Sequence, residues 1–215
     1  MSRTVDLLIF DLDGTLVDTR QDLANSINHT RQAYGLPELA LAEVMQYVGD
    51  GVRKLLERSL PDATPERVDA ALATFREHYG AHLLDHSTLY PGVGEVLQHF
   101  ADKKKAVLSN KPEGFTRTIL TGLGIADAFD LVLGGDSLSV LKPDPAAIHH
   151  ILTTLDVPPE KSVMVGDSPN DIKAGRAAGV LTCAVTYGYR GREELQAEAP
   201  DYLIDDLREL TEVFA

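Results

Sequence analysis

Residues 7–19 read LLIFDLDGTLVDT, an apolar run that ends abruptly in two carboxylates, Asp11 and Asp13. The apolar run is typical of a buried strand, and the following Asp18-Thr19 pair can cap a helix. A strand followed by a turn and a helix cap therefore accounts for Asp18 and Thr19. It does not account for Asp11 and Asp13, because their like charges repel and the turn needs neither of them. The stretch indicates a functional site as well as a fold.

The two carboxylates suit covalent catalysis. Asp11 could attack an electrophile and become a covalent intermediate, while Asp13 donates a proton to the leaving group and later takes one from water. If the electrophile is a phosphate, one pair of like unit charges at ~4 Å and an effective dielectric of ~20 costs about 4 kcal/mol. That is roughly three decades of rate. The hypothesis therefore requires cations: a divalent metal ion, a lysine, or both.

The composition is that of an ordinary globular protein. The chain has 215 residues, of which 44% are hydrophobic and 25% charged, enough for one sizeable core with a smaller inserted domain. Its 20 basic and 33 acidic residues give a net charge of −13, which argues against nucleic-acid partners and anionic membrane surfaces. Cys183 is the single cysteine, so no intrachain disulfide can form. With no signal peptide and no membrane-length apolar run, we expect a cytoplasmic protein.

From Tyr90 onward, short apolar runs alternate with helical patterns of about a dozen residues, which indicates a parallel α/β sheet. The expected strands span residues 106–108, 131–133, 162–165, 181–185 and 202–204. The expected helices span residues 94–104, 113–123, 145–155, 168–178 and 206–213.

Between the first strand and this region the sequence carries helical patterns alone. They cover residues 21–34, 41–48, 52–60 and 66–84. We therefore expect an α/β core made of residues 1–16 and 86–215, with residues 17–85 spliced in as a helical domain.

Polar residues follow four of the expected strands at their carboxyl ends. They are Asp11 with Asp13, Ser109 with Asn110, Gly135 with Asp136, and Asp167. In open parallel sheets, ligands bind beyond the carboxyl ends of the strands, at the point where the strand order reverses. The sequence thus predicts that these groups converge.

Three of the later stretches could supply what the Asp11 hypothesis requires. Ser109 at a helix start could bind a phosphoryl oxygen, or cap the helix. Lys142 stands next to Pro143 in a rigid stretch and could be the counter-cation, or a solvated loop lysine. Asp167 and Asp171 lie one helical turn apart; they could hold Mg2+ together with a substrate phosphate, or cap the helix.

Taken together, these stretches resemble the haloacid dehalogenase-like hydrolase superfamily. Its signature has D-x-D-G-T after a strand, a Ser or Thr after a second strand, a Lys, and G-D-x-x-x-D. All four parts occur here in that order, at residues 11–15, 109, 142 and 166–171. The resemblance spans the whole chain and implies a Rossmann-like, three-layer α/β/α core with a parallel sheet and an inserted helical cap domain.

The resemblance also implies roles for individual residues. Asp11 would be the nucleophile that becomes an aspartyl-phosphate, and Asp13 the general acid and base. Thr15 would hold the loop and contribute to phosphate binding, while Ser109 and Lys142 would bind the transferring phosphoryl group.

The implied cofactor is Mg2+. Its ligands would be Asp11, the backbone carbonyl of Asp13, and Asp167, with Asp171 either a ligand or a residue behind the ligands. Asn110, next to Ser109, is a further candidate for phosphate binding.

An Asp at position 13 favours phosphoryl transfer, since the branch of the superfamily that cleaves carbon–halogen bonds typically lacks it. Residues 11–19, 48–52, 109–112 and 134–136 resemble those of phosphoglycolate phosphatases, which cleave 2-phosphoglycolate to glycolate and phosphate. In the helical domain, Arg53 could meet a substrate carboxylate, or could simply be exposed.

Several alternatives stay open. The chain could hydrolyse another small organic phosphate or pyrophosphate, act as a sugar-phosphate mutase like β-phosphoglucomutase, or bind phosphate without catalysis. The expected partner is a small phosphorylated metabolite, and the expected assembly is a monomer or homodimer.

Overall fold

The computed structural model describes residues 3–215. The chain divides into two compact units. One consists of the residues up to Asp18 together with Leu89–Ala215, and the other of Thr19–Thr88. Two-residue strands, β2 (Val17–Asp18) and β3 (Thr88–Leu89), pair with each other where the chain passes between the units.

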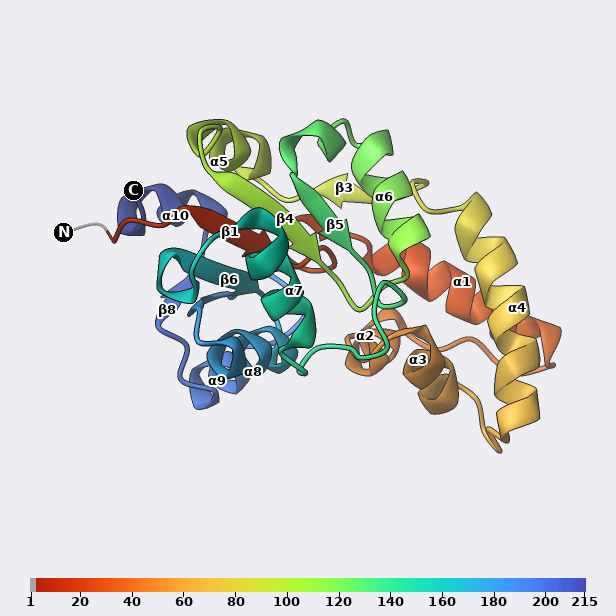
Figure 1. Ribbon diagram of the computed structural model, residues 1–215. Helices are drawn as coiled ribbons and strands as arrows, with labels where there is room; N and C mark the ends of the chain where they lie inside the picture. The colour runs from red at the N-terminus through yellow and green to blue at the C-terminus, as the bar shows by residue number, and fades with distance from the viewer. Residues whose placement is uncertain (1–2) are drawn as a thin grey trace. The chain divides into compact units, whose positions relative to one another are not determined.

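A six-stranded parallel sheet forms the centre of the first unit (Figure 1). Its strands are β1 (Leu7–Phe10), β4 (Lys104–Leu108), β5 (Leu131–Leu133), β6 (Ser162–Gly166), β7 (Leu181–Val185) and β8 (Tyr202–Ile204). The spatial order is β5-β4-β1-β6-β7-β8, and all neighbouring strands are parallel. The chain runs outward from β1 to β5 on one side and then returns to β6 on the other. The strand order therefore reverses at β1, which is where a parallel sheet places a ligand site.

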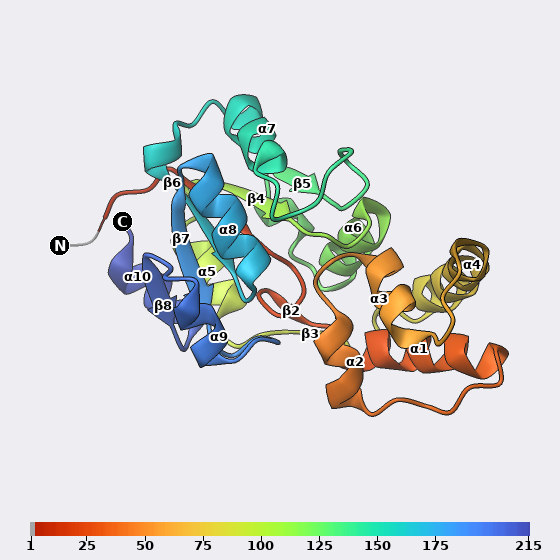
Figure 2. The same cartoon turned by 90° about the horizontal axis from the view of Figure 1, so that it is seen from below.

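Helices cover both faces of this sheet. They are α5 (Val93–His99), α6 (Glu113–Gly122), α7 (Ala146–Leu155), α8 (Pro169–Ala178), α9 (Arg192–Ala197) and α10 (Leu210–Val213). Helices α7 and α8 pack on one face through a buried apolar cluster that includes Ile9, Ile148 and Met164. Helix α5 lies on the opposite face (Figures 1 and 2). The predicted three-layer α/β/α fold is confirmed.

The second unit is helical, with α1 (Arg20–Ala33), α2 (Leu41–Tyr47), α3 (Val52–Ser59) and α4 (Pro65–Ala81). Helix α1 packs along α4, and α3 packs on both α2 and α4. The side chains of Leu56, Phe75 and Tyr79 are almost fully buried. Asp22 ties the end of the unit to its start, because its carboxylate accepts hydrogen bonds from the backbone and side chains of both His86 and Ser87.

Three helix predictions are wrong in part. The helix expected over 66–84 ends at Ala81. The helix expected over 94–104 ends at His99, and Lys104 already belongs to β4. The last helix, expected over 206–213, is a short 3-10 turn at Leu207–Glu209 followed by α10. Helix α9 was not predicted, since its sequence REELQA is too short and polar to show a clear apolar period.

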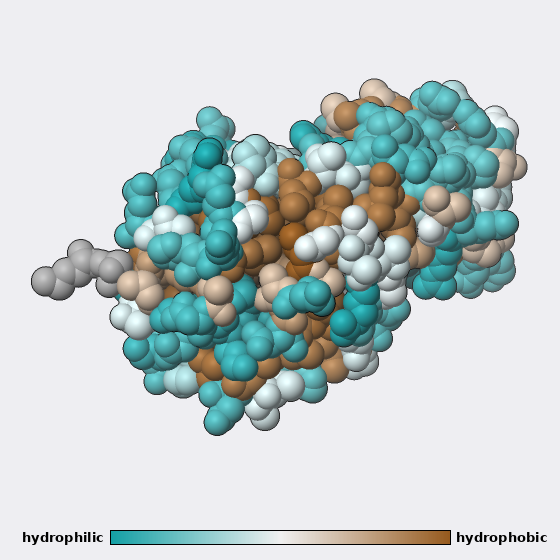
Figure 3. Space-filling model, turned by 90° about the horizontal axis from the view of Figure 1, so that it is seen from above, coloured by the Kyte–Doolittle hydropathy of each residue, from teal (hydrophilic) through white to brown (hydrophobic). Residues whose placement is uncertain are grey.

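The surface of the sheet-containing unit is mixed. Figure 3 shows an apolar area on it, bordered by hydrophilic residues. Among residues 3–215, no helix combines the length and the apolar character needed to span a membrane.

Candidate active site

The first two carboxylates stand where β1 ends. Asp11 leaves the sheet with its N–H still bonded to the carbonyl of Val165 at 2.9 Å, so β6 fixes its backbone. Its Oδ1 accepts the N–H of Leu12 at 2.7 Å. The chain then turns at Gly14, whose φ of 82° favours glycine. Asp11 is therefore aimed outward from the centre of the sheet, with only 9% of its surface exposed.

Lys142 is the cation that the Asp11 hypothesis requires. Its Nζ lies 3.0 Å from Asp11 Oδ1 and 2.7 Å from Asp171 Oδ1, and it also donates to the carbonyl of Leu108 at 2.7 Å. Burial by itself would lower the pKa of this ammonium, but the charges of Asp11 and Asp171 raise it above its usual value. The ammonium is therefore held charged against the Asp11 carboxylate.

Asn110 holds the backbone of Lys142. Its Nδ2 donates to the carbonyl of Lys142 at 3.0 Å, and the Lys142 N–H donates to Asn110 Oδ1 at 2.9 Å. These two bonds link the end of β4 to a loop 32 residues later in the chain. The Asn110 amide, which was predicted to bind phosphate, thus uses both its nitrogen and its oxygen to bond Lys142. Ser109 is the preceding residue, and its side chain is buried, with 3% of its surface exposed.

Asp171 lies in the first turn of α8, and each of its two carboxylate oxygens has a partner. Its Oδ1 contacts Lys142, and its Oδ2 accepts the N–H of Ser168 at 3.0 Å and the Ser168 hydroxyl at 2.6 Å. This is a capping box, so the helix-cap interpretation of Asp171 is confirmed, and its role toward a metal ion stays a prediction.

Asp167 is enclosed by two glycines. A Cβ on Gly14 would lie 2.2 Å from Asp167 Oδ2, and one on Gly188 would lie 2.4 Å from it. The Thr15 hydroxyl donates to Oδ1 at 3.3 Å, and the Tyr189 N–H donates to Oδ2 at 2.6 Å. The loop after β7 therefore fixes this carboxylate. Apart from Gly188 itself, no sequence pattern in this loop indicates that role.

The carboxylates form a group that fits a divalent cation. Asp11, Asp167 and Asp171 are buried, and each offers an oxygen within 4.8 Å of the other two. Burial raises the pKa of Asp11 to about 7, although Lys142 lowers it, and burial together with the charge of Asp11 raises the pKa of Asp167 well above its usual value. The neighbouring groups therefore do not fully stabilise the negative charges of Asp11 and Asp167.

The charge count agrees with the geometry. The carboxylates of Asp11, Asp13, Asp167 and Asp171 face the ammonium groups of Lys142 and Lys111. With all six ionised, the cluster keeps an excess of two negative charges, which one Mg2+ would balance. Mg2+ prefers such hard oxygen ligands, typically one or two carboxylates with a substrate phosphate.

Lys111 lies in the stretch 109–112, where the sequence alone predicts no role for it. Its Nζ lies 2.5 Å from Asp13 Oδ1, and the two side chains are 5% and 13% exposed. The contact joins residues 98 positions apart, so local sequence patterns could not have predicted it.

Residues 8–185 match the model of one protein family, described as haloacid dehalogenase-like hydrolase. The chain belongs to this family. It is 38% identical to "Phosphoglycolate phosphatase 1" of Pseudomonas aeruginosa, over 97% of this chain and 79% of that protein. It is also 38% identical to "Phosphoglycolate phosphatase" of Colwellia psychrerythraea, over 95% of both chains. The crystal structure of a predicted phosphoglycolate phosphatase from Haemophilus somnus covers 97% of both chains with a TM-score of 0.92 and 34% identity. The predicted resemblance is confirmed.

Two residues singled out in the sequence of this hydrolase have partners elsewhere. Asp136, after β5, accepts the N–H of Glu113 at 2.7 Å and so caps α6. Arg53 lies in the helical unit, where it forms an ion pair with Asp69 and is half exposed. Its role toward a substrate stays a prediction.

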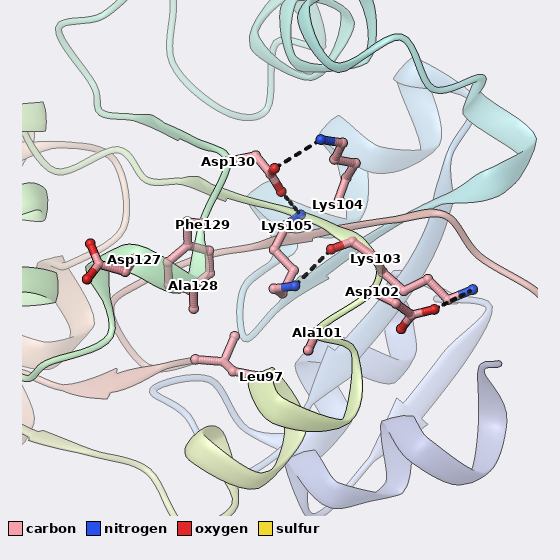
Figure 4. A pocket seen from close by; sticks show the side chains of 10 residues that line it. All are labelled: Leu97, Ala101, Asp102, Lys103, Lys104, Lys105, Asp127, Ala128, Phe129 and Asp130. Carbon is pink, nitrogen blue, oxygen red and sulfur yellow. Dashed lines mark hydrogen bonds and ion pairs between the residues drawn. The ribbon is translucent and has the colours of Figure 1, made fainter.

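A pocket of about 400 Å³ lies at the opposite end of β4 from Ser109 (Figure 4). Lysine side chains line this pocket, and two of them bind other groups of the protein. Lys104 pairs with Asp130 at 3.1 Å, and the Lys105 ammonium donates to the carbonyls of Phe100 and Lys103. The ammonium groups of Lys104 and Lys105 are therefore already bound within the protein.

Proposed function

We propose that this chain is a Mg2+-dependent phosphomonoesterase that forms an aspartyl-phosphate on Asp11 and hydrolyses 2-phosphoglycolate to glycolate and phosphate. The observation that carries the chemistry is the buried contact of Lys142 with Asp11 at 3.0 Å, beside Asp13 and Asp167. The names of the relatives, at 38% identity over nearly the whole chain, support the substrate.

In the first step, a carboxylate oxygen of Asp11 forms a bond to phosphorus as the bond from phosphorus to the ester oxygen breaks. Asp13 gives its proton to that ester oxygen, and glycolate leaves. In the second step, water attacks the phosphorus, Asp13 takes a proton from the water, and the bond between Asp11 and phosphorus breaks. The sum is ester plus water giving alcohol plus phosphate.

Lys142 and Ser109 would bind the oxygens of the transferring phosphoryl group. Catalysis then consists mostly of positioning and of charge stabilisation in a site with little water. Asp171 also contacts the Lys142 ammonium, at 2.7 Å, and Asn110 holds the Lys142 backbone.

Asp11, Asp167 and the backbone carbonyl of Asp13 would hold Mg2+. When bound, the ion supplies positive charge that offsets the repulsion between Asp11 and the phosphate. Asp171 is better suited to positioning, because Lys142 and Ser168 already occupy its two oxygens.

The domain assignment belongs to the same proposal, with the helical unit as a cap that sets the substrate and Arg53 as its candidate contact. We further propose a cytoplasmic monomer or homodimer acting on a small metabolite. The buried thiol of Cys183 is compatible with a reducing compartment.

The test is phosphate release from a panel of esters, with and without Mg2+. The panel contains 2-phosphoglycolate, hexose phosphates, nucleotides and pyrophosphate. We expect Mg2+-dependent release with a clear preference for 2-phosphoglycolate, abolished in Asp11→Asn. Release from another ester would replace the substrate, an isomerised sugar phosphate would indicate a mutase, and full activity of Asp11→Asn would overturn the mechanism.

A further inference from the structure

Lys111 presents its ammonium at a defined point beside Asp13. Its backbone is held on both sides, because its N–H donates to Ser109 Oγ at 3.2 Å and its carbonyl accepts the N–H of Gly135 at 2.8 Å. A Cβ on Gly134 would lie 2.7 Å from that carbonyl, so the neighbouring loop is packed against it. The side chain is consequently carried on rigid backbone at the end of β4.

An ion pair made only for stability is a weak explanation of this contact. Taking two charges out of water costs about as much free energy as their attraction returns, and apolar replacements are often neutral. Here the pair is 5% and 13% exposed and lies on the residue that we assign to proton transfer. Its position is therefore better explained by what binds next to Asp13.

We propose that Lys111 binds the carboxylate of the substrate's leaving group and so makes the site selective for phosphate esters that carry a second anion. This rests on the proposed function, in which Asp13 protonates the ester oxygen. In 2-phosphoglycolate a single methylene separates that oxygen from the carboxylate carbon. A cation in hydrogen-bond contact with Asp13 is therefore within reach of the substrate carboxylate. An ammonium has three N–H donors, so it can contact Asp13 and a second anion together.

The burial of Lys111 strengthens this recognition. Hydrogen bonds between charged groups are stronger where water is excluded. Arg53, the sequence-based candidate for the same carboxylate, is half exposed and paired with Asp69. Lys111 is also attached to the same unit as Asp11 and Asp13, so its place at the site needs no contribution from the helical unit.

The test compares two esters that differ in the charge of the leaving group: 2-phosphoglycolate and 2-hydroxyethyl phosphate. Lys111→Gln keeps a hydrogen-bond donor for Asp13 and removes the charge. Its kcat/KM for 2-phosphoglycolate should fall about tenfold to a hundredfold, the fold-change expected for one lost charge-assisted hydrogen bond. The rise in KM should dominate that loss, and the loss on 2-hydroxyethyl phosphate should be at least tenfold smaller.

Lys111→Arg should keep most of the selectivity. Lys104→Met is the matched control, since this half-exposed lysine at the start of β4 pairs with Asp130 away from the site. It should leave both rates unchanged. If Lys111→Gln does not fold, Lys111→Met is used instead, and its losses in kcat/KM on the two esters are compared in the same way.

Equal losses on the two esters would overturn the proposal and leave Lys111 as a positioning residue for Asp13. A wild-type protein that hydrolyses neither ester would overturn the proposed function instead, and with it the role of Lys111.

Discussion

The side-chain amide of Asn110 bonds both backbone groups of Lys142, donating to its carbonyl at 3.0 Å and accepting its N–H at 2.9 Å. Because each side of the amide is used, the position of the Lys142 backbone depends on one side chain at the end of β4. The cation beside the nucleophile is thereby fixed from the sheet.

Replacing Asn110 with Ala should impair activity more than stability. The change removes two buried hydrogen bonds, which should lower the free energy of unfolding by about 2 kcal/mol. Displacing Lys142 by as little as ~1 Å should lower kcat by roughly a hundredfold. Steady-state kinetics and denaturant melts measure the two effects. Asn110→Asp keeps the acceptor for the Lys142 N–H, so its kcat and stability should lie between those of the wild type and Asn110→Ala. A normal kcat in Asn110→Ala would contradict this account.

Gly188→Ala should weaken Mg2+ binding. The added Cβ would lie 2.3 Å from Asp167 Cβ and 2.5 Å from the Gly14 carbonyl, so Asp167 must move. We expect a loss in affinity of roughly tenfold to a hundredfold, as for other residues that orient metal ligands, measured by titration calorimetry with Mg2+. Gly191→Ala, in the same loop with open space around it, should bind Mg2+ normally. Equal affinities in the two variants would show that the close approach does not position Asp167.

The Asp22 carboxylate should make the helical unit sensitive to acid. Burial alone would raise its pKa, but hydrogen bonds from Ser87 and His86 outweigh burial and lower it. A folded-state pKa below the unfolded value means that the stabilisation is complete above about pH 4 and is lost as pH falls through the folded pKa. Urea melts between pH 3 and pH 6 should therefore show a smaller change in Asp22→Asn than in the wild type. If the free energy of unfolding changes equally with pH in the two proteins, the prediction is wrong.

The contribution of His78 to stability should depend on pH in a higher range than that of Asp22. It stacks between His29 and His82, with ring centroids 4.0 and 4.4 Å away, and its Nδ1 lies 2.9 Å from Ser26 Oγ. Burial and the two neighbouring rings lower its pKa, although Asp85 opposes them. Protonation then favours the unfolded chain, so its contribution is present above about pH 6.5 and declines below it. Between pH 7.5 and pH 5.5, the free energy of unfolding should fall less in His78→Phe than in the wild type, as measured by urea melts. An equal fall in the two proteins would show that His78 does not cause the pH dependence.

The fold could be predicted from the sequence where it depends on local patterns. Apolar runs located the strands, and Asp11 and Asp167, which follow two of them, were predicted to lie close together. The reversal of strand order at β1 explains why they meet.

Contacts between distant segments were beyond the sequence. Lys111 meets Asp13 across 98 residues, and Tyr189 meets Asp167 across 22, and neither pair leaves a periodic pattern. The misplaced end of α5 has a similar cause. Lys104 looks like the end of a polar helix, yet pairing with β1 draws it into a strand, because tertiary contacts override weak local propensity.

The most direct test of the central claim is to trap the intermediate on Asp11. The enzyme is quenched in acid during turnover of 2-phosphoglycolate with Mg2+, then reduced with borohydride, which converts a phosphorylated aspartate to homoserine, and mapped by mass spectrometry. We predict homoserine at position 11 in the wild type, dependent on substrate, and none in Asp11→Asn. Turnover without modification at position 11, or modification at another carboxylate, would contradict the account.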